Sequence, residues 1–248
     1  MRKTALGLVV CAFALVSTVA GTARAAHVSS LCGAVPYSYA GVIGRQPARG
    51  IMATVEPTVG PRIDHGHVAA WVGVGGAGLG PGGTNEWLQV GLAATESAST
   101  ELYYEVTEPH RAPQFVALHG LVTVGHSHRI GVIEMGARPN WWRVWLDGRP
   151  VTRPIELRAS HDQWAPVATS ESWNGGVPSC NAFGYTFKNI RWSTRNRNIW
   201  RPLVNGHRLS APGYAVRLTA LSGMVVSGGT APPIVVADIR TPSIPTLS

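Results

Sequence analysis

Short runs of alternating apolar and polar residues recur along this chain between Gly-rich and Pro-rich turns. The sequence contains 29 Gly and 18 Pro, and no stretch repeats apolar residues with helical spacing over three turns. Runs rich in Val, Ile, Tyr, Trp and Thr predict strands at residues 51–56, 67–74, 85–92, 102–107, 115–124, 129–135, 141–146, 167–173, 183–191 and 214–220. This pattern is typical of an antiparallel β-sandwich, so we expect an all-β fold.

The clearest hairpin lies between residues 141–146 and 149–151, with Asp147-Gly148 as its turn. A two-residue type I′ turn needs positive φ at both central positions, which Asp-Gly provides. The hairpin carries a cluster of three tryptophans: Trp141, Trp142 and Trp145. We expect them to pack in the core, with a sugar-stacking platform as the alternative.

Successive side chains of a strand point to opposite faces, so alternation predicts which residues share a surface. In residues 67–74 an apolar face is formed by Val68, Ala70, Val72 and Val74, which leaves His67, Ala69 and Trp71 on the other face. By the same rule, Trp87 and Gln89 lie opposite an apolar face, and Glu171 and Trp173 share a side. If these strands are neighbours, one sheet surface carries an aromatic groove with one amide and one carboxylate.

The N-terminus predicts export from the cell. Arg2 and Lys3 precede an apolar run from Ala5 to Ala20, and residues 23–25 have the small-x-small pattern of a signal peptidase site. The apolar run is shorter than a membrane span. We therefore expect a signal peptide at 1–25, one β-sandwich domain at 26–229, and a Pro/Thr/Ser-rich tail at 230–248 of a secreted, monomeric protein without a membrane anchor.

Cysteine use fits an oxidising compartment. Cys11 lies in the expected signal peptide, which leaves Cys32 and Cys180 as the two cysteines of the exported chain. We predict that they form a disulfide, because neither has another cysteine to pair with.

The charge balance argues against a nucleic-acid partner. The whole chain carries a net charge of +8, and loss of Arg2, Lys3 and Arg24 reduces the 21 basic residues to 18, against 13 acidic residues. The remaining excess of about +5 is scattered singly along the chain rather than clustered in a stripe. Neither a Gly-x-Ser-x-Gly elbow nor a phosphate-binding glycine loop occurs, which argues against a common serine hydrolase and a nucleotide enzyme.

Several stretches resemble the eqolisins, or glutamic peptidases. Ala69-Ala70-Trp71-Val72-Gly73-Val74-Gly75-Gly76 is similar to the family's Ala-x-Trp-Val-Gly-Ile-Asp-Gly strand, and Leu88-Gln89-Val90-Gly91 to its Leu-Gln-Thr-Gly segment. Tyr103-Tyr104-Glu105 is similar to its Trp-Tyr-Glu, and residues 167–171 fall where the family has the strand that ends in its catalytic glutamate. Phe183-Gly184-Tyr185-Thr186-Phe187 resembles the alternating aromatic strand that follows in the family, and the likeness spans about residues 37–220 in order and spacing.

The resemblance implies a concanavalin A-like jelly roll that hydrolyses peptide bonds at acid pH. It makes Gln89 and Glu171 the catalytic pair, without a metal or another cofactor. Glu171 would act as general base and acid, and Gln89 would bind the oxyanion. It also implies a substrate groove that contains Trp71, Trp87, Glu105 and Trp173, with a polypeptide as the partner.

Two departures from the family pattern keep a second hypothesis open. Gly75 and Ala93 stand where the family has aspartates that support the catalytic pair. If Gln89 and Glu171 are ordinary polar residues of a sheet face, the chain is a non-catalytic secreted β-sandwich whose aromatic groove binds a cell-surface glycan or a peptide.

Two pairs of histidines could in principle bind a metal ion. They are His65 with His67 and His126 with His128, each two residues apart and thus on one face of a strand. Neither pair has a clear third ligand, so we expect solvent-facing histidines near strand ends and no metal site.

Overall fold

The computed structural model describes residues 33, 37–96, 99–176, 179–194, 199–220 and 222–229. The expected signal peptide, the expected tail and Cys32 lie outside these residues, so the predicted disulfide stays a prediction. Within the described residues, no helix is long and apolar enough to cross a membrane.

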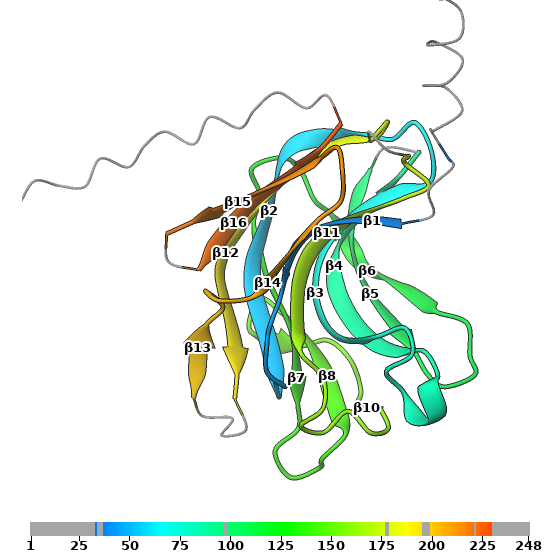
Figure 1. Ribbon diagram of the computed structural model, residues 1–248, viewed down its shortest axis with the longest axis vertical. Coiled ribbons are helices and arrows are strands. Elements are labelled where there is room, and N and C mark those ends of the chain that lie inside the picture. Colours follow the sequence, from blue (N-terminus) through cyan, green and yellow to red (C-terminus); the bar gives the residue numbers. More distant parts are fainter. Residues whose placement is uncertain are drawn as a thin grey trace, which may run out of the picture.

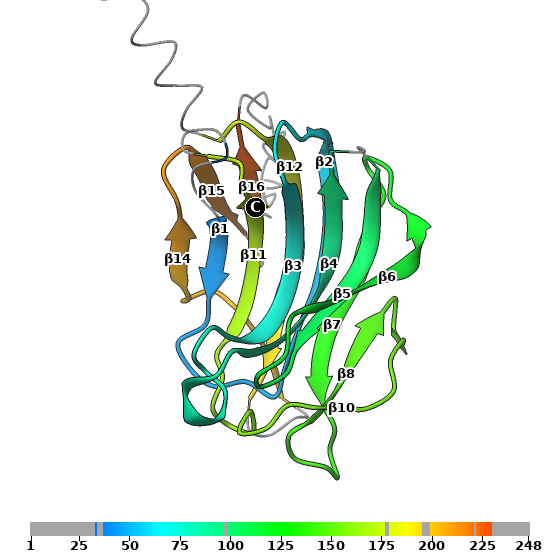
Figure 2. The same ribbon diagram turned by 90° about the vertical axis from the view of Figure 1, so that its right-hand side faces the viewer.

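Two antiparallel sheets pack face to face (Figure 1), which confirms the predicted all-β sandwich. The seven-stranded sheet has the order β14-β1-β11-β3-β4-β5-β6 (Figure 2). Its strands are β1 Tyr37–Ile43, β3 His67–Gly76, β4 Glu86–Thr95, β5 Thr100–Thr107, β6 Gln114–Leu121, β11 Pro166–Trp173 and β14 His207–Ser210. A short 3₁₀ turn, η1 Pro81–Gly83, lies between β3 and β4.

The nine-stranded sheet has the main order β10-β8-β7-β2-β12-β16-β15, with β13 paired to β12 and β9 paired to β8. Its strands are β2 Gly50–Arg62, β7 His128–Glu134, β8 Trp141–Leu146, β9 Arg149–Pro150, β10 Ile155–Glu156, β12 Ala182–Ser193, β13 Trp200–Pro202, β15 Tyr214–Thr219 and β16 Gly223–Gly228. The predicted runs all coincide with strands, whereas β1, β10, β13, β14 and β16 were not predicted.

One apolar core fills the space between the sheets. The seven-stranded sheet contributes Val68, Val72 and Val90, and the nine-stranded sheet contributes Ile51 and Phe187, all fully buried. Apolar burial of this kind is the main favourable term in folding. It also fixes the register, because a slip by one residue would turn each apolar face toward solvent.

The Asp147-Gly148 turn has the predicted geometry, with φ of 49° at Asp147 and 83° at Gly148. The expectation for the tryptophan cluster is met by Trp142 alone, whose side chain is fully buried and donates from Nε1 to Ser160 Oγ at 2.9 Å. Trp141 and Trp145 are half-buried, because they alternate with Trp142 and point away from the core. Arg138 lies 3.9 Å from the centre of the Trp141 ring.

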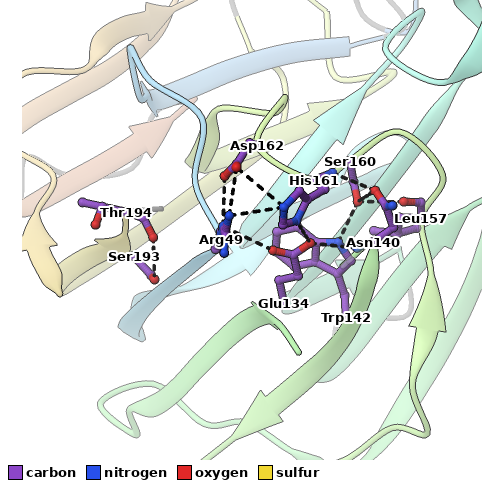
Figure 3. Close-up of polar contacts among 10 residues, drawn as sticks. All are labelled: Arg49, Glu134, Asn140, Trp142, Leu157, Ser160, His161, Asp162, Ser193 and Thr194. Atoms are coloured by element: carbon purple, nitrogen blue, oxygen red, sulfur yellow. Dashed lines mark hydrogen bonds and ion pairs between the residues drawn. The ribbon is translucent and has the colours of Figure 1, made fainter. Parts of the chain in front are cut away.

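A polar network anchors the loop after β10 to the ends of β2 and β7 (Figure 3). Glu134, with an almost fully buried side chain, accepts hydrogen bonds from the Asn140 N–H and from His161 Nδ1, both at 2.8 Å. Arg49 lies 3.7 Å from Glu134 and forms a bidentate pair with Asp162. A buried carboxylate is tolerated only when it is paired and hydrogen-bonded, and here both conditions hold.

Gly91 provides a test of the tight packing on the outer face of the seven-stranded sheet. A Cβ at this position would lie 2.3 Å from the Ala70 carbonyl oxygen and 2.6 Å from Trp71 Cβ. We predict that Gly91→Ala lowers the free energy of unfolding by about 2 kcal/mol in urea titrations, because β3 must shift to accept the methyl group.

The matched control is Gly60→Ala on β2, where the nearest atom to the new methyl group would be Val124 Cγ2 at 3.9 Å. This variant should stay within about 0.5 kcal/mol of the unsubstituted protein. Equal effects of the two substitutions would contradict the packing argument.

Candidate functional site

A cavity of about 340 Å³ opens on the face of the seven-stranded sheet that points away from the core. Its lining brings together Gln89 from β4 and Glu171 from β11. Trp71, Trp87 and Glu105 line the same cavity, so alternation and strand order bring five of the six proposed site residues to one place. Trp173 does not line this cavity; it lies 39% exposed at the end of β11 and stacks on His67.

Gln89 is held by a buried tyrosine. The Gln89 side chain is only 6% exposed, and its Nε2 donates to Tyr103 Oη at 3.0 Å. Tyr103 is buried, and its ring stacks on Phe115 at a centroid distance of 4.8 Å. A primary amide has two N–H donors, so Gln89 keeps a second donor for a ligand in the cavity.

Glu171 is buried beside a histidine, a tyrosine and one other carboxyl group. Glu171 is only 6% exposed, and its Oε1 lies 3.4 Å from His67 Nε2. Directly across the β1–β11 pair lies Tyr39, and burial together with the charge of Glu171 raises the pKa of this phenol. Tyr39 therefore remains a neutral donor at any pH at which Glu171 could act.

Glu105 is the second carboxyl group of the cavity. It pairs across the strands with Gln89 and accepts a hydrogen bond from Trp87 Nε1 at 2.8 Å. Burial raises the pKa of Glu105, the Trp87 hydrogen bond opposes this, and the nearby Glu171 raises it further. A like charge nearby disfavours the charged form of a carboxyl group, which is why Glu171 acts on Glu105 in this direction.

A smaller hollow of about 180 Å³ adjoins the first, because both are lined by His67, Glu105 and Glu171. Its other lining residues include Glu101, Tyr103 and Phe115. The two hollows together form one groove, with Glu171 in its middle. We call this the candidate groove.

The floor of the candidate groove is made of small residues. Ala69 and Ala93 lie directly opposite each other on β3 and β4, and they pack with Tyr103 and Trp71 in a cluster separate from the main core. Nε1 of Trp71 is buried without a hydrogen-bond partner among the described residues. Unpaired buried donors are rare in native proteins, so this indole N–H is a notable feature of the groove wall.

No protein-family model matches the sequence, and no curated protein matches it either. Solved protein structures, in contrast, match this chain. A crystal structure of scytalido-glutamic peptidase with a peptide-based transition-state analogue matches with a TM-score of 0.50 and 14% identity, over 79% of this chain and 99% of that one. SCP-B, a member of the eqolisin family solved with the tripeptide Ala-Ile-His, matches with a TM-score of 0.45 and 14% identity, over 78% and 97%.

The chain has the fold of the glutamic peptidases. The resemblance seen in short sequence motifs thus agrees with a structural similarity that covers 79% of the chain. The fold alone does not assign an activity, because activity belongs to the site and not to the scaffold.

Residues of the candidate groove that sequence reasoning missed include Tyr37, Tyr39, His67 and Tyr103. His67 was expected to face solvent, but its side chain is only 31% exposed and contacts Glu171. Alternation had placed His67 on the same face as Trp71, so the signal was present. The described residues hold no group of three His, Cys, Asp or Glu that could bind a metal ion.

Glu86 lies at the start of β4, beside the loop that borders the candidate groove. It is fully buried; its Oε1 accepts the Arg158 N–H at 2.5 Å, and its Oε2 has no partner among the described residues. Burial raises the pKa of Glu86 to about 7, against the opposing N–H and charge of Arg158. The neutral acid is therefore the form that this site prefers.

This preference makes stability depend on pH. The pKa of Glu86 is higher in the folded state than in the unfolded chain. The stabilisation of the fold by neutral Glu86 is therefore complete below about pH 4.5, and it is lost as the pH rises through about 7. We predict that Glu86→Gln raises the free energy of unfolding at pH 8 by about 2 kcal/mol and has little effect at pH 4, measured by urea titration.

The control is Glu56→Gln on the nine-stranded sheet, where the carboxylate pairs with Lys188 at the surface. This variant should not gain stability at pH 8. An equal response of Glu86→Gln at the two pH values would show that the buried carboxyl group is not the cause.

Proposed function

We propose that the protein is a secreted hydrolase that cleaves peptide bonds in polypeptides at acid pH. The observation that carries this proposal is the shared cavity, in which an anchored Gln89 amide and a buried Glu171 carboxylate lie on a glutamic-peptidase fold. The aromatic walls formed by Trp71 and Trp87 would hold the extended substrate.

The residues can carry out hydrolysis without a covalent intermediate. The Glu171 carboxylate would take a proton from a water molecule, whose oxygen then bonds to the carbonyl carbon of the substrate. The second N–H of Gln89 would donate to the oxyanion that develops on that carbonyl. Protonated Glu171 would next give its proton to the amide nitrogen, so that the C–N bond breaks and Glu171 is a carboxylate again.

We predict that the exported chain cleaves a denatured, fluorescently labelled polypeptide between about pH 2 and 5, because at acid pH a glutamate can both take a proton from water and return it to the leaving amine. Glu171→Gln should lower kcat at least about 100-fold, since glutamine keeps the shape of glutamate but takes no proton from water. Gln89→Glu should also fail, because a carboxylate donates no hydrogen bond to an oxyanion.

The control for this experiment is Glu56→Gln, which makes the same chemical change far from the candidate groove and should keep full activity. Pepstatin-type inhibitors, which target a pair of aspartates, should not block the reaction. Absence of proteolysis over the whole pH range, with an intact fold by circular dichroism, would refute the peptidase.

One observation favours a second candidate function, binding of a glycan or peptide without catalysis. Tyr37, Tyr39 and Trp173 carry exposed rings beside the candidate groove, at 48%, 37% and 39% exposure. Exposed aromatic faces of this kind stack on sugar rings and on peptide side chains. If proteolysis is absent, quenching of tryptophan fluorescence by soluble oligosaccharides or peptides would support this reading.

A further inference from the structure

His67 is the first residue of β3 and lies beside the carboxylate proposed as catalytic base. Its Nε2 is 3.4 Å from Glu171 Oε1. Its ring stacks on Trp173 at 5.6 Å with an interplanar angle of 23°, and meets Tyr37 edge-on at 6.5 Å. The ring is therefore held from two sides, with one nitrogen directed at Glu171.

The chain that leads into His67 is fixed as well. Asn181 is fully buried and accepts the N–H groups of Asp64 and His65, while its Nδ2 donates to the His65 carbonyl at 2.9 Å. Gly66 has φ of 69°, and a Cβ there would lie 2.2 Å from the Trp173 carbonyl oxygen. The turn thus packs directly against the end of β11, so His67 does not behave as a mobile surface histidine.

The charges around His67 are almost all negative. The residues that line the two hollows include three carboxyl groups, Glu101, Glu105 and Glu171, and no Lys or Arg. The phenols of Tyr37 and Tyr39 on β1 and of Tyr103 on β5 face the same carboxyl groups and stay neutral, because burial raises the pKa of each. Among the described lining residues, His67 alone can carry a positive charge.

We propose that His67 is a positioning residue for Glu171: its imidazolium donates from Nε2 to Glu171 Oε1, fixes that oxygen, and balances the carboxylate charge of the groove. This inference rests on the proposed function. The hydrogen bond leaves Glu171 Oε2 to accept the proton of the attacking water. His67 keeps its own proton throughout the reaction, so the proton taken from water still passes through Glu171 to the leaving amine.

The arrangement makes activity depend on two titrations. Protonation of the carboxylate removes the base at low pH, and loss of the imidazolium proton removes the positive partner at higher pH. A peptidase with this pair should show a bell-shaped dependence of kcat on pH. The groups that modulate it from neighbouring strands are Glu171 on β11, Glu101, Glu105 and Tyr103 on β5, and Tyr37 and Tyr39 on β1.

The first test is kinetic. His67→Gln keeps a hydrogen-bond donor without the charge, and His67→Phe removes both. We expect kcat at the optimum to fall by about 10-fold in His67→Gln and about 100-fold in His67→Phe, the range found for residues that orient reactive groups. The high-pH limb of the kcat profile should disappear in His67→Gln, an effect that a merely structural role would not produce.

The matched control is His128→Gln, because His128 also pairs with a carboxylate, Asp147 at 2.9 Å, but lies on the nine-stranded sheet. Its kcat profile should match that of the unsubstituted protein. An unchanged kcat and an unchanged pH profile in both His67 variants would overturn the proposal.

The second test does not need activity. The imidazole resonances of His67, followed by NMR against pH, should titrate about 0.5 unit or more lower in Glu171→Gln than in the unsubstituted protein, because the neighbouring negative charge is gone. This shift without any proteolysis would refute the proposed peptidase function and support the proposed interaction of His67 with Glu171. Superimposed titration curves would refute the pair, whether or not the protein cleaves peptides.

Discussion

Apolar packing between the two sheets decides where every side chain of the candidate groove lies. Val68 and Val72 of β3 and Val90 of β4 are fully buried against the nine-stranded sheet. Because successive residues of a strand point to opposite faces, the burial of these valines turns Trp71 and Gln89 outward. A slip of either strand by one residue would bury the amide and expose the valines, so the hydrophobic register that stabilises the fold also assembles the groove.

The sequence was informative wherever a property depends on neighbouring positions within one strand. Alternation alone placed Trp71, Trp87, Gln89 and Glu171 on outward faces. The dipeptide Asp147-Gly148 was enough to predict the turn that it forms. What alternation cannot provide is the order of the strands. Strand β11 lies between β1 and β3 although 122 residues separate it from β1 and 89 from β3, and only this order sets Glu171 beside Tyr39 and His67.

The structure also accounts for the two departures from the glutamic peptidase pattern. Gly75 has φ of 87°, and a Cβ there would lie 2.3 Å from the Glu86 carbonyl oxygen, so no aspartate fits this backbone. Ala93 packs in one cluster with Ala69 and Tyr103, and its methyl group lines the smaller hollow, where the family's aspartate would add a further carboxyl group beside Glu101 and Glu105. The groove is thus built on small floor residues, and Tyr103 holds Gln89 from the side.

The electrostatics of the groove follow from its burial. Glu105 and Glu171 share one cavity, and in surroundings of low dielectric two carboxylates repel each other more strongly than in water. Burial already favours the neutral form of Glu105, and the charge of Glu171 adds to this. As the pH falls, Glu105 therefore takes up a proton above its ordinary pKa range, and the cavity loses one negative charge. Fewer carboxylates then surround His67, the one residue of the described groove lining that can carry a positive charge, so burial of Glu105 reduces the excess of negative charge in the groove.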